Sequence, residues 1–153
     1  MKHTDRKGSS LQRGQSFVEL ALGLVFFLFI LIGMFDLGRA YYIYVALKDS
    51  ANEAALYLAV NHTCPVQYPP EEDKPECNDP NNAWYRAKNA SSLQISWDSV
   101  TITQQYYTDA VAGDMVKVRM EYPFSLLTPI ISNIVGSNTL KLGAEASHVI
   151  LKL

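Results

Sequence analysis

The sequence lacks the side-chain groupings on which most enzymes depend. Its three histidines, His3, His62 and His148, are far apart in the chain, and His62 next to Cys64 is the only candidate metal-type pairing. There is no glycine-rich phosphate loop, no Cys-x-x-Cys pair and no His-x-x-x-His motif. We therefore expect no catalytic residue, no metal site, no cofactor and no small-molecule substrate, and we predict that the chain is not an enzyme.

Net charge and cysteine are also scarce. The formal net charge is −2 at pH 7, which gives no electrostatic footprint for nucleic acid. The two cysteines, Cys64 and Cys77, both follow the long apolar run of the chain. An even number in an exported region predicts one disulfide, which would close a loop over residues 64–77. Two reduced thiols, or half of a metal site, are the alternatives.

What the sequence does contain is a continuous apolar run from Leu20 to Phe35, in which every residue is apolar or glycine. Residues 1–14 before it form a basic leader, and Glu19 lies at its threshold. A membrane-spanning helix needs about 20 residues, which predicts a span over residues 17–37. Asp36 and Arg39 are three apart on this helix, so they can form an ion pair at the outer interface.

Three fates of this N-terminal region are possible. Gly38-Arg39-Ala40 offers small residues for an ordinary signal-peptide cleavage, which would release an exported protein. Against this, Glu19 interrupts the start of the apolar run, and the helical pattern continues past Ala40. Alternatively, the chain keeps its leader as a single-pass anchor, or the leader is cut just before the apolar run.

The junction resembles a type IV prepilin site. Gly14, four residues, Glu19 and then a long apolar helix follow a short basic leader, and Gly14 to Leu22 is similar to the pattern of TadE-like minor pilins of tight-adherence pili. The later Asp36-Leu37-Gly38-Arg39 and the segment from Val116 to Pro129 also resemble that family. The resemblance implies an N-terminal pilin helix, cleavage between Gly14 and Gln15, and an assembly charge at Glu19.

The same resemblance implies partners and a location. A prepilin peptidase would cut the leader on the cytoplasmic side, and Glu19 would neutralise the new amine of Gln15 on a neighbouring subunit. We expect other pilin subunits and a pilus assembly platform as partners, in the inner membrane, with the C-terminal domain extracytoplasmic. The alternative function is an uncleaved single-pass assembly factor or extracytoplasmic binding module.

The chain beyond the apolar run predicts a small α+β domain. Tyr41, Tyr42 and Tyr44 are expected at the outer interface, as an aromatic belt. Helical spacing then continues, so residues 15–60 are expected to form one helix, whose outer half packs on the protein's own sheet. Asp79 or Asn81 is expected to cap a short helix from Asn82 to about Leu93.

Residues 61–153 form this extracytoplasmic domain. Prolines and acidic residues make the region from Asn61 to Ala83 a solvated loop. Alternating residues predict strands around Ile95–Ile102, over Met115–Tyr122 with Pro123 ending it, and over Leu140–Ala146. Phe124 to Val135 is expected to be a short helix or hydrophobic loop, packed on the domain's own core or exposed to a partner. The predicted fold is pilin-like: a long N-terminal helix packed on a small antiparallel sheet.

Overall fold

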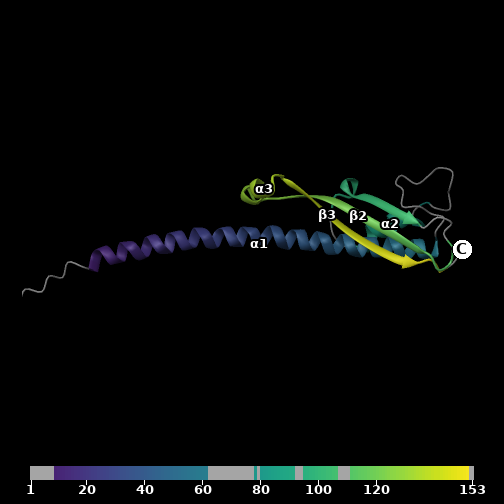
Figure 1. The fold of residues 1–153 in the computed structure, drawn as a ribbon, viewed down its shortest axis with the longest axis horizontal. Helices are drawn as coiled ribbons and strands as arrows, with labels where there is room; N and C mark the ends of the chain where they lie inside the picture. The colour runs from purple at the N-terminus through teal and green to yellow at the C-terminus, as the bar shows by residue number, and fades with distance from the viewer. Residues whose placement is uncertain (1–8, 62–77, 79, 92–94, 107–110, 152–153) are drawn as a thin grey trace, which may run out of the picture.

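The computed structural model describes residues 9–61, 78, 80–91, 95–106 and 111–151. The chain forms one very long helix and a small sheet that lies along the C-terminal half of that helix (Figure 1). Helix α1 runs over Ser9–Val60, α2 over Ala83–Ala90 and α3 over Pro129–Val135. A short 3₁₀ turn, η2, spans Trp97–Ser99. The strands are β1, Thr101–Tyr106, β2, Met115–Ser125, and β3, Thr139–Val149.

Helix α1 is continuous over 52 residues, which corresponds to a length of about 78 Å. Its sequence contains no proline, so nothing removes a backbone hydrogen bond along its length. The predicted single helix is confirmed. It begins at Ser9 rather than Gln15, because the residues from Ser9 to Gly14 join the helix instead of forming a separate tail.

The sheet has the strand order β1-β2-β3, and both pairs are antiparallel. In β2, Val116, Val118 and Met120 point to the buried face, as their alternation predicts. Lys117, Arg119 and Glu121 alternate with them on the other face. The α+β arrangement expected from the sequence is therefore confirmed.

The core lies between this sheet face and α1. Leu47 and Leu58 are fully buried there, and each contributes about 1.5–3 kcal/mol on burial. Ala51, Ala54 and Ala55 are buried between them, and their small side chains bring the helix close to the sheet. The predicted packing of the outer half of α1 on the protein's own sheet is thus correct.

Three local predictions differ from the structure. Pro123 does not end β2, which continues to Ser125, since Pro123 pairs with Lys141 of β3 and lies beyond the last β1 partner, Glu121. A proline is tolerated where one side of a strand has no ladder to complete. Helix α2 is capped by Asn82, whose side chain accepts a hydrogen bond from the Tyr85 N–H at 2.6 Å. Trp97 lies in η2 and not in a strand.

The apolar segment from Phe124 to Val135, which includes the end of β2, reaches beyond the sheet toward the N-terminal half of α1. Figure 1 shows α3 alongside α1, on the side of the sheet that faces the N-terminus. Phe124 is buried, while Leu127 and Ile134 are exposed. The expected short helix is present as α3, with one part of the segment packed inside and another part exposed.

Candidate functional site

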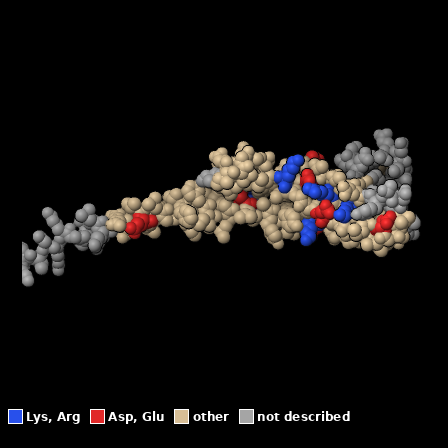
Figure 2. All heavy atoms as spheres, in the orientation of Figure 1, with Lys and Arg blue, Asp and Glu red and all other residues tan. Residues whose placement is uncertain are grey.

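The N-terminal half of α1 presents an apolar surface to its surroundings. Every residue from Gly14 to Ile30 is exposed, including Phe17 at 73%. Among the described residues, one helix is long and apolar enough to cross a membrane, and it is this one. Figure 2 shows that Lys and Arg gather over the sheet. The surface between the acidic atoms nearest the N-terminus, drawn in red, and α3 is almost entirely uncharged. This half of α1 fits a membrane anchor.

Glu19 lies immediately before the apolar run, at its N-terminal end. It lies one helical turn after Gln15, whose Nε2 donates a hydrogen bond to Glu19 Oε1 at 3.1 Å. Both side chains are exposed. The structure therefore places the predicted assembly charge and the predicted new N-terminus next to each other on one helix face.

Gly14 lies within α1, five residues after its start. A Cβ at Gly14 would meet no atom within 4 Å, so no described contact requires glycine there. Glycine in a helix interior costs about 0.5–1 kcal/mol relative to alanine. Gly14 consequently makes α1 easier to unwind at the predicted cleavage site.

Asp36, the residue directly after the apolar run, is almost fully buried at 3% exposure. Its carboxylate accepts hydrogen bonds from the Leu127 N–H at 3.2 Å and the Thr128 N–H at 3.0 Å. The Thr128 hydroxyl donates a third. Asp36 therefore ties α1 to the residues immediately before α3, and we call Asp36, Arg39, Leu127 and Thr128 the Asp36 clamp.

Arg39 completes the clamp from the same helix. Its Nη1 lies 3.4 Å from Asp36 Oδ1, as the i, i+3 spacing allows. Its guanidinium also stacks over the Phe124 ring, with 5.1 Å between Cζ and the ring centroid. Arg39 thus contacts both the acid on α1 and the end of β2, and a stacked cation of this kind contributes about 0.5–1 kcal/mol at an exposed position.

An apolar groove adjoins the clamp. Its lining comes from α1, from the segment before and within α3, and from β3: Ile30, Gly33, Met34, Asp36, Leu37, Leu126, Ile131 and Leu140. Across this groove, Ile131 Cδ1 lies 4.0 Å from where a Cβ on Gly33 would stand. Ile131 therefore packs against α1 at Gly33, at ordinary van der Waals distance from a side chain of one carbon.

The sequence did not reveal the partners of Asp36. They are 91 and 92 residues away in the chain, and helical spacing shows only the local partner, Arg39. One signal was available. Thr128 followed by Pro129 is the pattern of a helix N-cap before proline at the first helical position, and such an N-terminus attracts a carboxylate.

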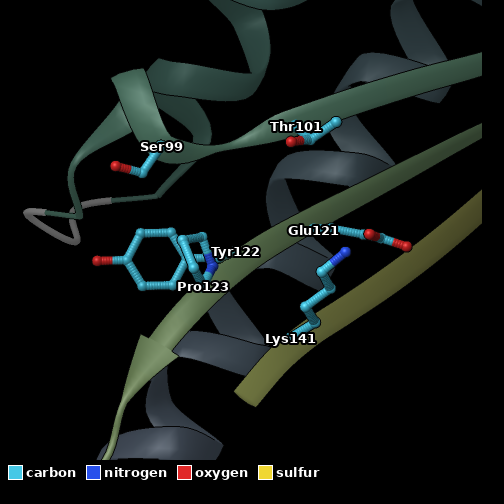
Figure 3. A pocket seen from close by; sticks show the side chains of 6 residues that line it. All are labelled: Ser99, Thr101, Glu121, Tyr122, Pro123 and Lys141. Carbon is cyan, nitrogen blue, oxygen red and sulfur yellow. The ribbon is translucent and has the colours of Figure 1, made fainter. Parts of the chain in front are cut away.

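The remaining candidates offer little for chemistry. A small hollow on the outer face of the sheet is lined by Ser99, Thr101, Glu121, Tyr122, Pro123 and Lys141 (Figure 3). Within the described residues no group of three His, Cys, Asp or Glu could hold a metal ion. His148 Nε2 lies 2.9 Å from Asn52 Oδ1, a contact between β3 and α1. The predicted disulfide partners, Cys64 and Cys77, lie outside the described residues.

Comparison with known proteins finds a family match over most of the long helix. The model of the family described as "TadE-like protein" matches residues 14–56, which are the apolar half and most of the sheet-packed half of α1. No curated protein and no solved structure matches the chain significantly. The family match begins at Gly14, the residue before the predicted cleavage, and includes Glu19, Asp36 and Arg39. It confirms the resemblance stated from the sequence, and it shows that residues 14–56 of this chain are similar to the TadE-like family.

Proposed function

We propose that this chain is a minor pilin-like subunit or assembly component of a tight-adherence pilus. It is inserted in the inner membrane through α1, with its N-terminus cytoplasmic and its sheet domain outside. A prepilin peptidase cuts between Gly14 and Gln15, and the subunit joins other pilins at the assembly platform for adhesion or secretion. Its role is structural and not enzymatic.

One observation carries this proposal, namely the uncovered apolar surface of α1. Burying a large apolar side chain is worth about 1.5–3 kcal/mol, and this surface exposes many of them in succession. A membrane can cover it before assembly, and neighbouring α1 helices can cover it in a filament. The match of α1 to a pilin-type family favours both in turn.

Glu19 supplies the specificity of the filament contact. A carboxylate inside a bilayer costs about 2–3 kcal/mol on insertion scales. Cleavage after Gly14 would create an amine on Gln15, and the Gln15 of a neighbouring subunit would give this carboxylate an opposite charge. Pairing of this kind fixes register more securely than it adds stability.

Processing and assembly are tested separately. Intact-mass measurement of the protein from cells with an active prepilin peptidase should give a chain that starts at Gln15. In the same cells, Glu19→Ala should still be cleaved but should abolish most incorporation into sheared pili. Asp49→Asn is the matched control, because it removes an exposed acid from the sheet-packed half of the same helix. Normal incorporation of Glu19→Ala would contradict the role of Glu19.

A second function is favoured by the start of α1 at Ser9. Because the helix continues through Gly14, the chain can also persist as an uncleaved single-pass anchor, acting as an assembly factor or extracytoplasmic binding module. A mature mass that begins at Met1, unchanged when the peptidase is deleted, would establish this function and exclude the pilin. A mature chain that begins near Tyr41 would exclude both, since α1 would then be a removed signal peptide.

A further inference from the structure

The segment around α3 has no charged residue to keep it in water. From Tyr122 to Leu140 the sequence contains 19 residues without Asp, Glu, Lys or Arg. Its exposed members include Leu127 at 66%, Ile134 at 79% and Val135 at 47%. An exposed patch of this kind on a surface segment indicates a contact with another apolar phase.

The position of α3 beside α1 indicates that this apolar phase is the lipid bilayer. Ile131 packs at Gly33 and Thr128 bonds to Asp36, so α3 lies beside the last residues of the apolar run of α1. Gly33 precedes Asp36 by three residues, which is about 4.5 Å along the helix axis. If α1 crosses the membrane over residues 17–37, α3 is at the depth of the outer leaflet. Interfacial helices bury their apolar face about 5–10 Å into that boundary.

The backbone of the segment is also prepared for an apolar environment, where unsatisfied N–H and C=O groups are costly. Asp36 accepts from the N–H groups of Leu127 and Thr128, and Ser132 N donates to Thr128 O at 3.1 Å. The Ser132 hydroxyl donates to Pro129 O at 2.8 Å. Leu126 N donates to Asn138 O at 3.0 Å, which closes the base of the segment.

We propose that α3 is a second membrane-contacting element, which lies in the outer leaflet beside α1 and touches lipid through Leu127, Ile134 and Val135. The inference rests on the proposed insertion of α1 in the membrane. It gives Asp36 a function, because its carboxylate satisfies the donors of a segment that enters lipid. Continuity with the apolar surface of α1 favours lipid over a protein partner, since the same bilayer that surrounds α1 meets α3.

The test uses the full chain reconstituted in vesicles of phosphatidylethanolamine and phosphatidylglycerol, with and without bromine on the acyl chains. Ile134→Trp adds a fluorophore at the tip of the patch, and the native Trp84 and Trp97 give the constant background measured on the unsubstituted chain. Acyl-chain bromine should remove most of the emission added by Ile134→Trp. Asn89→Trp, on the exposed surface of α2, is the matched control and should keep its added emission.

Phe27→Trp reports on α1 and separates the two ways of failing. If Phe27→Trp is quenched and Ile134→Trp is not, the lipid contact of α3 is wrong while the anchor stands. If neither is quenched, the membrane insertion of α1 fails, and with it the basis of both proposals. A third outcome is a blue-shifted emission from Ile134→Trp that bromine does not quench, with a blue shift that disappears when excess lipid dilutes the protein. This result would show that a second copy of the chain covers α3, and it would overturn the lipid contact.

Discussion

At the scale of single residues, Asp36 joins α1 to the segment before α3. Burying a carboxylate is unfavourable unless hydrogen bonds compensate, and here two backbone N–H groups, a hydroxyl and Arg39 do so. The sequence predicted the contact with Arg39 as an outer-interface pair. The structure shows the contact, together with three donors from the α3 side that the spacing along one helix does not reveal.

Replacing this carboxylate should loosen α3 without unfolding the sheet. Asp36→Ala leaves the Leu127 and Thr128 N–H groups without acceptors, which costs about 1–3 kcal/mol locally. We expect faster hydrogen exchange at these two amides, measured by mass spectrometry in detergent micelles. Asp36→Asn keeps one acceptor oxygen and should show a smaller effect, and the exposed Asp98→Asn should show none. Unchanged protection at Leu127 in Asp36→Ala would contradict the clamp.

Gly14 gives a second prediction at this scale. Gly14→Ala adds a side chain that meets no described atom but stabilises the helix by about 0.5–1 kcal/mol. If the peptidase needs an unwound, extended chain at this site, cleavage should slow several-fold in a pulse-chase experiment. Gly23→Ala adds the same methyl group to the same helix and should leave the rate unchanged. Faster cleavage of Gly14→Ala would show that helix opening does not limit processing.

At the scale of elements, α3 packs on α1 at a glycine, Gly33. Gly33→Leu would fill the space taken by Ile131, whose Cδ1 lies 4.0 Å from the new Cβ position. Overpacking of this sort costs about 1–3 kcal/mol. We expect Gly33→Leu to raise protease sensitivity after β2, whereas Gly23→Leu, with open space around it, should behave as the parent chain.

The contact between α1 and the sheet gives a second prediction at the scale of elements. Ala55 is fully buried against the sheet core, so Ala55→Leu should lower the free energy of unfolding by about 1–3 kcal/mol. Urea unfolding followed by circular dichroism measures this. Val60→Leu enlarges a residue that is 45% exposed at the end of the same helix and should change stability little.

Sequence patterns predicted elements whose cause is local. The apolar run, the alternation of Val116, Val118 and Met120, and the buried alanines of α1 all follow from period and composition, and the structure agrees. Predictions failed where a contact with a residue distant in sequence determines the local structure. Pro123 stays in β2 because β1 has already ended. Helix α3 lies beside α1 because Asp36 accepts a hydrogen bond from the Thr128 N–H and Ile131 packs at Gly33. Such neighbours are distant in sequence and leave no periodic signal.

At the scale of the whole molecule, the domain is joined to α1 at two separate places. The sheet packs on Leu47 to Leu58, and α3 attaches at Gly33 and Asp36. A fragment of residues 40–153 keeps the first contact and loses the second. We expect it to retain the strands by circular dichroism and to lose hydrogen-exchange protection around Thr128. A fragment of residues 30–153 should recover that protection, and equal exchange in both would show that the two attachments are not independent.

The double attachment has a mechanical consequence. Between Asp36 and Leu58 the helix is unbroken, so no flexible joint separates the apolar half of α1 from the half that packs on the sheet. A pulling force applied to the sheet is transmitted along this stiff helix, to which the α3 segment adds a second attachment at Asp36 and Gly33. If α1 is inserted in the membrane as proposed, this force reaches the apolar half of α1 directly. The sheet domain and the apolar half of α1 would then leave the bilayer together, as one rigid body.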